Sequence, residues 1–459
     1  MNTDQTTEVT AVLATSFDAS EQLPVTTDVE PPVEEIQPVE QLPKPFDFDK
    51  ARPLNPAGFP NQSQGGNSIL GTITNLEFLL HSYRIQTSYN VITKKLEICF
   101  AGMTTTIDNA EEVALNYIIS LAILNNMSTA NIAGFVATIA DRNQINPVAD
   151  WITSKEWDGI DRLPLYYATL TARDDFPVQL KEKLMYCWLL SAIAAALKST
   201  GFRARGVITL QGKQGLGKST WVKSHIPVQP LCDQVIKIDH NLDTHNKDSQ
   251  ITALSHLIVE LGEIEGSLKK DIAKLKGFLT SDFDKLRRPY ARTTSELPRR
   301  TVFAATVNEE QFLVDSTGNT RFWTIPVIAV DYNHNVDMQQ VFAQLKVDFD
   351  NGVEWWLSKD YEELLESFNN ANHRVVNVIQ ERVMNAIDVS RSNKSTLEAL
   401  TASEVLNKIG IRFPTNQQAK DCAAVLRQLL GDSKRINGLN KWRVGFKQNQ
   451  PFADDEYYN

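Results

Sequence analysis

The spacing of apolar and polar residues predicts a chain in which helices alternate with buried strands. Helical spacing occurs over residues 74–83, 109–125, 128–142, 178–198, 341–349 and 353–368. Short apolar runs of strand type occur over residues 206–211, 257–261, 301–307 and 322–327, and residues 89–100 resemble two strands around a turn. Buried strands separated by helices or long connections are typical of a mostly parallel sheet covered by helices. The expected fold class is therefore α/β.

The C-terminal pattern differs from the rest and predicts a separate small unit. A capped helix is expected over 401–410 and a second helix over 415–430, and Asn437-Gly438 separates two strand-like runs. An Asn-Gly pair in that position is a strong hairpin signal. Two helices followed by a basic hairpin resemble a winged helix, a module that binds DNA or mediates protein contacts. We favour DNA because the hairpin carries Lys434, Arg435, Lys441, Arg443 and Lys447.

The N-terminal segment has a composition of its own. Residues 1–50 hold 11 acidic and 2 basic residues, and nine of the 19 prolines precede residue 61. Few apolar side chains are available there to offset the entropy cost of ordering. We therefore expect residues 1–66 to form a disordered acidic tail that acts as a spacer. The alternatives are docking to a basic partner protein, or competition with DNA for a basic groove of the same protein.

The rest of the chain is nearly neutral and divides into four expected parts. The net charge is -10 for all 459 residues, and the tail carries most of it. We expect an N-terminal α+β or helical domain over 67–175, which is a candidate oligomerisation collar, and a core domain over 176–330. A helical extension over 331–395 and the winged-helix-like module over 396–459 follow.

Cysteine use and hydropathy limit the cellular setting. The four cysteines are scattered without a CxxC pair, which excludes a disulfide scaffold and a Cys-based zinc module and suits a reducing cytosol. The longest apolar run, Met185–Leu197, is too short to cross a bilayer. The N-terminus has no basic region followed by an apolar one, so we expect no signal peptide and no membrane partner.

The strongest chemical signal is the sequence GKQGLGKST at 212–220, directly after the expected strand 206–211. It fits the phosphate-binding pattern G-x-x-x-x-G-K-[ST]. Glycines let backbone N–H groups curl around phosphates, Lys218 places an ammonium against the β- and γ-phosphates, and the Ser219 hydroxyl is a ligand for Mg²⁺. ATP and Mg²⁺ are therefore the expected cofactors. The predicted nucleotide-binding residues are Gly212, Gly215, Leu216, Gly217, Lys218, Ser219 and Thr220.

Two later segments offer the acids and the sensor that a phosphate loop requires. The strand-like run 257–261 contains Glu260, and Glu263 follows a Gly turn. We assign Glu260 to Mg²⁺ or its water shell and Glu263 to activating water, although the two roles could be exchanged. The run 301–307 ends at Asn308, a candidate sensor of the γ-phosphate. Arg321 follows on a loop, where it could reach the ATP of a neighbouring subunit or could stack on an aromatic ring for packing.

A basic run lies between the acidic and the sensor strands. Residues 285–300 hold six basic residues, one acid and Tyr290, a pattern that suits a single-strand channel. A solvated charged face is the ordinary alternative. The position between two ATPase strands favours a hairpin or loop that contacts DNA. Its candidate residues are Lys285, Arg287, Arg288 and Arg292.

The order of these motifs resembles the virulence-associated protein E family of phages and phage-related islands. The segments are GKQGLGKST, IVELGEIEG, LKGFL, RRPYAR, FAATVN and DSTGNTRFW, and the similarity covers about residues 140–330. The family is similar to superfamily 3 helicases. The resemblance implies an AAA+-like P-loop ATPase, a hexameric ring, and unwinding or translocation during DNA replication in a bacterial host. It supports Lys218 and Ser219 for nucleotide, Glu260 with Glu263 as the acidic pair, Asn308 as sensor and Arg321 as finger.

The sequence therefore predicts an ATP-driven, ring-forming DNA helicase that acts on single-stranded and forked DNA. The first alternative is a DNA-binding replication initiator or loader that uses ATP as a switch without unwinding. The second is a P-loop kinase for small molecules. A kinase explains neither the acidic pair on a separate strand nor the basic hairpin.

Overall fold

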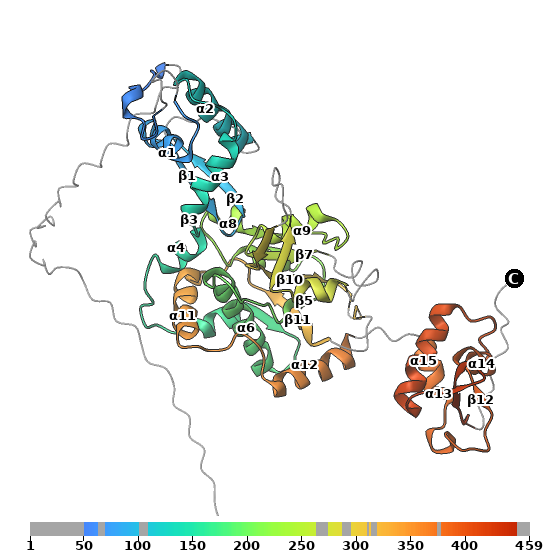
Figure 1. Cartoon of the computed structure of the whole chain (residues 1–459). Helices are drawn as coiled ribbons and strands as arrows, with labels where there is room; N and C mark the ends of the chain where they lie inside the picture. The colour runs from blue at the N-terminus through green and yellow to red at the C-terminus, as the bar shows by residue number, and fades with distance from the viewer. Residues whose placement is uncertain are drawn as a thin grey trace, which may run out of the picture.

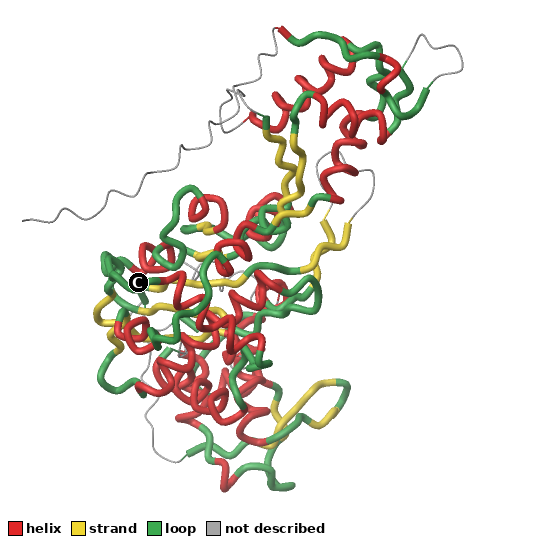
Figure 2. Tube along the Cα trace, turned by 90° about the vertical axis from the view of Figure 1, so that its left-hand side faces the viewer, coloured by secondary structure: helices red, strands yellow, loops and turns green. Residues whose placement is uncertain are grey.

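The computed structural model describes residues 50–62, 69–100, 109–262, 274–286, 295–309, 312–313, 319–373 and 378–447. It is a mixed α/β structure with helices and several mixed sheets (Figure 1). Figure 2, turned by 90°, shows two strands that lead from the N-terminal helices towards the main body, and further strands among the helices of that body. No helix in the described ranges is long and apolar enough to cross a membrane.

A six-stranded sheet forms the centre, in the order β4-β11-β5-β10-β7-β6. Five neighbouring strands are parallel, and only β4 at one edge runs antiparallel. The bounds are β4 Leu170–Ala172, β5 Val207–Gln211, β6 Ile236–Lys237, β7 Ile258–Leu261, β10 Val302–Val307 and β11 Phe322–Val330. All four strands expected from apolar runs are present. Parallel strands end at a common edge, so the residues that follow β5, β7 and β10 lie near one another.

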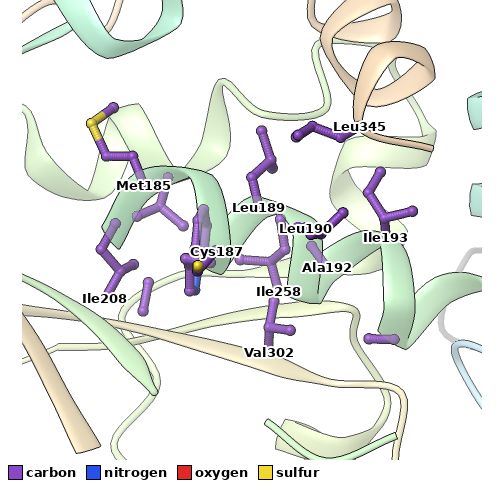
Figure 3. Packing of buried hydrophobic residues seen from close by; sticks show 14 of the residues in the cluster. Met185, Cys187, Leu189, Leu190, Ala192, Ile193, Ile208, Ile258, Val302 and Leu345 are labelled. Carbon is purple, nitrogen blue, oxygen red and sulfur yellow. The ribbon is translucent and has the colours of Figure 1, made fainter. Parts of the chain in front are cut away.

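The longest helix, α6 (Val178–Leu197), is buried against this sheet. From Leu184 to Ala196 nearly every side chain of this helix is buried, on all of its faces, which is typical of a helix inside a core. In Figure 3, Leu190 and Ala192 lie above Ile258 and Val302 of the sheet, and Leu345 of α11 (Met338–Asp350) lies on the other side. The Trp188 indole donates to the Phe303 carbonyl at 2.8 Å, which fixes the helix on β10.

Shorter helices complete the layers around the sheet. Their bounds are α4 Pro147–Thr153, α5 Leu163–Ala168, α7 Lys218–Lys223, α8 Leu231–Val235, α9 Lys247–Leu254, α11 Met338–Asp350 and α12 Lys359–Asn372. The helix expected over 353–368 begins later because Ser358 takes an extended N-cap conformation. Val148 of α4 and Tyr166 of α5 belong to the core of the central sheet. The packing boundary therefore precedes α4, and the expected boundary at 175 is too late.

The N-terminal unit has a second, three-stranded sheet, in the order β2-β1-β3. Its elements are α1 Ile73–Ser82, β1 Gln86–Asn90, β2 Lys95–Cys99, α2 Ala110–Leu124, α3 Ile132–Arg142 and β3 Gln144–Ile145. The expected strand–turn–strand is β1 and β2. The helix expected from Ser128 begins instead at Ile132, because Asn131 in the left-handed region interrupts it (φ 65°).

The expected tail boundary at residue 66 is wrong for residues 50–62. Phe59 is 2% exposed and packs edge-on against Phe78, with ring centroids 4.9 Å apart. Leu54 donates its N–H to the Asn125 side chain at 2.7 Å, and Tyr83 donates its hydroxyl to the Arg52 carbonyl at 2.8 Å. A few anchoring contacts therefore order this Pro-rich segment despite its composition. Residues 1–49 lie outside the described residues.

This correction gives a testable result. Deleting residues 1–49 is expected to leave the thermal unfolding midpoint unchanged, because the acidic composition there supplies little core. Phe59→Ala is expected to lower the stability of the N-terminal unit by about 3–5 kcal/mol, the usual cost of removing a buried phenylalanine ring. Differential scanning calorimetry of both variants measures this. A Phe59→Ala variant as stable as the parent would show that the segment contributes no core.

The C-terminal unit has a core of its own. It comprises a 3-10 turn, Val389–Arg391, and the elements α13 Val378–Ala386, β12 Ala399–Leu400, α14 Ala402–Lys408, α15 Asn416–Leu430, β13 Lys434–Ile436 and β14 Leu439–Arg443. Thr401 and Thr415 cap the two expected helices with complete capping boxes. Asn437-Gly438 forms the expected turn with both φ angles positive. Because α13 packs in this core, the unit begins near 378 and not at 396.

Candidate functional site

The glycine-rich loop lies between β5 and α7, at the edge of the sheet where the parallel strands end. Gly215 (φ 84°) and Gly217 (φ 81°) adopt left-handed backbone conformations that favour glycine. A Cβ on Gly212 would approach the Val327 carbonyl oxygen to 2.5 Å. The strand, loop and helix expected around this motif are therefore present, and its glycines meet backbone and steric requirements.

Lys218 is the first residue of α7, and its ammonium turns back into the loop. Its Nζ donates to the carbonyls of Gly212 (2.6 Å) and Lys213 (2.8 Å), and to the Asn308 side-chain oxygen (3.0 Å). Asn308 follows β10, the strand beside β5. The sequence-predicted lysine and sensor residue, which are far apart in the chain, are thus in direct contact.

Glu260 on β7 is fully buried, with 0% exposure. One carboxylate oxygen accepts from the Ser219 hydroxyl (3.2 Å) and the Thr306 hydroxyl (2.5 Å), and the other accepts from the Asp239 N–H (2.6 Å). A buried carboxylate normally requires such partners. Ser219 and Glu260, the two residues predicted to bind metal, are therefore neighbours.

This donor set fits a magnesium ion held together with phosphates. Mg²⁺ prefers hard oxygen ligands and is commonly held by one or two protein groups, retained waters and substrate phosphates. The Ser219 hydroxyl can ligate the ion with a lone pair while it still donates its proton to Glu260. Glu260, whose oxygens already accept three hydrogen bonds, fits a role in orienting the ligand and the ion's water shell. In the described parts of the chain, no cluster of three His, Cys, Asp or Glu residues forms an all-protein metal cage.

The four predicted catalytic positions have different outcomes. Glu260 and Asn308 lie at the glycine-rich loop, as described above. Glu263 lies outside the described residues. Arg321 ends a 3-10 turn, Asn319–Arg321, directly before β11, and its neighbour Phe322 pairs with Val207 at the start of β5. Arg321 therefore lies where the parallel strands begin, whereas Lys218 of the same chain lies where they end.

The basic run forms part of a hairpin, as expected. β8 (Phe283–Leu286) pairs antiparallel with β9 (Ser295–Pro298), and Lys285 lies opposite Glu296. Arg287, Arg288 and Arg292 lie outside the described residues. The last two basic residues of the run have structural contacts. Arg299 is 1% exposed with its guanidinium 4.7 Å from the Phe278 ring centroid, and Arg300 donates to the Ala196 carbonyl at 2.7 Å.

Four of the five basic residues predicted on the C-terminal hairpin differ in their surroundings, and the fifth, Lys447, is exposed after β14. Lys434 and Arg435 on β13 are exposed. Lys441 is half-buried and forms an ion pair with Glu404 at 3.6 Å. Arg443 donates to the carbonyls of Ser395 and Leu397, which ties β14 to the preceding loop. Lys434 and Arg435 are therefore the best placed of the four for a phosphate backbone.

Two residues that hold Glu260 in place, Thr306 and Asp239, are not among the residues predicted from the sequence. Thr306 near the end of β10 and Asn308 directly after this strand are two positions apart, so their side chains lie on the same side, where Thr306 contacts Glu260 and Asn308 contacts Lys218. A polar residue inside the apolar run 301–307 was the available signal. Asp239 follows β6, and Gly262 permits its approach, because a Cβ there would lie 2.2 Å from the Asp239 carboxylate. No sequence signal identified this second contact.

A buried polar network supports α7 from behind. The His225 Nδ1 donates to the Trp221 carbonyl at 3.0 Å, so its Nε2 accepts from the Tyr166 hydroxyl at 3.0 Å. Burial lowers the pKa of His225 to about 4, so the ring is neutral near pH 7. The Trp221 indole donates to the Thr169 hydroxyl at 2.8 Å. These contacts fix the helix that carries Lys218 and Ser219.

Comparison with known proteins agrees with the resemblance seen in the sequence. Residues 152–374 match the family model of the virulence-associated protein E-like domain. None of the curated proteins matches the chain.

Solved structures of the NrS-1 C-terminal region are among the structural neighbours. The apo structure of residues 305–718 is 15% identical to this chain, with a TM-score of 0.37. The match covers 81% of this chain and 98% of the NrS-1 chain. The A form apo structure is 16% identical, with the same TM-score, and covers 81% and 99%.

Proposed function

We propose that this protein is an ATP-dependent, ring-forming DNA helicase or translocase that acts in the DNA replication of a phage or mobile element. The observation that carries the proposal is the contact set at one sheet edge, where Lys218 contacts Asn308 and Ser219 contacts Glu260. β10 lies between the loop strand β5 and the acidic strand β7. Asn308 therefore follows the strand that lies between the strand before Lys218 and the strand that carries Glu260, which supports the proposed sensor role in an oligomeric P-loop motor of the AAA+ type.

Each residue has a distinct part in hydrolysis. When ATP binds, the Lys218 ammonium leaves the Gly212 and Lys213 carbonyls and the Asn308 side chain and contacts the β- and γ-phosphates. A bound Mg²⁺ would neutralise part of the phosphate charge. Ser219 holds the ion, and Glu260 orients Ser219 and the surrounding water. Asn308, which shares a contact with Lys218, senses whether the γ-phosphate is present. Glu263 is the proposed base that activates the attacking water.

The position of Arg321 supports an oligomeric site. An arginine finger stabilises the charge of the transition state and can be supplied by a neighbouring subunit. Arg321 lies where the parallel strands begin, away from Lys218, so it does not complete the site of its own chain. The proposed assembly is a closed ring of six subunits, in which one subunit presents Arg321 to the nucleotide of the next.

Two basic hairpins are the proposed DNA contacts. The β8–β9 hairpin lies in the segment that joins the acidic strand to the sensor strand, and Arg299 anchors its base between Phe278 and Phe303. Its movement can therefore follow the nucleotide state. The C-terminal unit has the order α13-β12-α14-α15-β13-β14, which supports a winged helix with Lys434 and Arg435 on the wing.

The experiment compares ATP hydrolysis and strand displacement in one preparation. We expect hydrolysis that single-stranded DNA stimulates, and ATP-dependent displacement of a strand from a forked duplex. Stimulated hydrolysis without displacement would favour the alternative, an initiator or loader that uses ATP as a switch. Absence of ATP hydrolysis with and without DNA would contradict the proposal.

A further inference from the structure

The loop after β11 lies against the glycine-rich loop. A Cβ on Gly217 would be 2.2 Å from Cδ1 of the Tyr332 ring, so only glycine allows this approach. Tyr332 is nevertheless 38% exposed. One part of the ring therefore contacts the residue before Lys218, and another part is open to solvent.

Hydrogen bonds on both sides hold the segment that carries this ring. Asp331 donates its N–H to the Thr169 carbonyl at 2.8 Å. His334 and Ser224, at the end of α7, share a hydrogen bond of 3.0 Å between Nε2 and Oγ. The segment that carries Tyr332 is thus fixed to the elements that support the loop, and the ring position is a built feature of the site.

The sheet order assigns the two sides of the loop to different parts of a nucleotide. β5 has β10 on one side and β11 on the other. Asn308 and Glu260 lie on the β10 side, where the γ-phosphate and its ion belong. The other end of an extended nucleotide therefore points to the β11 side. Tyr332 follows β11 on that side.

We propose that Tyr332 stacks on the base of the bound nucleotide and so selects a nucleoside triphosphate over a bare polyphosphate. Aromatic rings stack on bases because both present a π-face, and this contact tolerates different bases. The inference rests on the proposed function, because it needs a triphosphate at Lys218. It adds a binding residue that the phosphate-loop motif does not contain.

The test is to measure the binding of ATP and of inorganic tripolyphosphate, each with Mg²⁺, by isothermal titration calorimetry. The variants are Tyr332→Ala, Tyr332→Phe, and Tyr117→Ala as a matched tyrosine of 37% exposure in the N-terminal unit. We expect Tyr332→Ala to weaken ATP binding about tenfold, in line with the loss of one stacked base. Tripolyphosphate binding should stay within about twofold, and Tyr332→Phe and Tyr117→Ala should resemble the parent.

The other outcomes separate the two ideas. If the parent binds neither ligand, the proposed function fails. If the parent binds ATP and Tyr332→Ala binds it equally well, the stacking inference fails. It also fails if Tyr332→Ala binds ATP more tightly, because the ring would then block the site. An equal loss of ATP and tripolyphosphate in Tyr332→Ala would also overturn it, because the ring would then act only by shaping the loop.

Discussion

Lys218→Ala is expected to abolish ATP hydrolysis while the protein stays folded. The ammonium is the one side-chain cation of the motif that faces the loop, where it contacts Gly212, Lys213 and Asn308. Removing it deletes the charge that would stabilise the transferred phosphoryl group, a change that typically costs a hundredfold to a thousandfold in rate, so about that loss or more is expected. Steady-state phosphate release measures the effect.

Lys213→Ala is the matched control, because Lys213 is an exposed lysine of the same loop. It should hydrolyse ATP at nearly the parent rate. Circular dichroism should show an unchanged unfolding midpoint for both variants. Parent-like hydrolysis by Lys218→Ala would mean that the loop is not the nucleotide site.

Glu260→Gln is expected to bind ATP but to hydrolyse it at least about a hundredfold more slowly. The substitution keeps the side-chain shape and removes the negative charge that orients Ser219 and the ion's water shell. The Gln carbonyl oxygen can still accept from the Asp239 N–H, but the Gln NH2 would then face the Ser219 and Thr306 hydroxyls, which now donate to the carboxylate, so a small loss of stability is also expected. Binding assays and phosphate release separate the two effects.

Glu309→Gln provides the comparison, since Glu309 is an exposed carboxylate that follows the neighbouring strand β10. Its hydrolysis rate should match the parent. ATP binding by Glu260→Gln would itself show that the site is folded. Should Glu260→Gln hydrolyse ATP normally, Glu260 is a structural acid and the catalytic role belongs to another residue.

The central sheet could be predicted because its strands carry strong local signals. The runs 206–211 and 301–307 are apolar, short and bounded by turn residues, so their type was clear from sequence. Their order was not, because strand order depends on which connections cross the sheet. The contact between Lys218 and Asn308 depends on β10 lying beside β5, which the local sequence pattern does not predict.

Errors arose where distant contacts override local composition. The segment around Phe59 resembles a disordered tail, yet its ring is buried by Phe78. Helix α13 resembles part of a helical extension, but Val383 packs in the C-terminal core. Tyr332 had no motif to mark it, because its significance lies in its approach to Gly217. Sequence reasoning finds residues with distinctive local patterns and misses residues whose role comes from a distant neighbour.

The position of β5 also has a consequence for how the chain folds during synthesis. β5 pairs with β10 and β11, and Val207 meets its partner Phe322 only after the whole intervening segment has been made. Non-local parallel pairing folds slowly and exposes apolar surface meanwhile. The nascent chain therefore leaves the ribosome with β5 and the apolar helix α6 uncovered until β11 emerges. Truncated products that end before Val330 should aggregate or recruit chaperones.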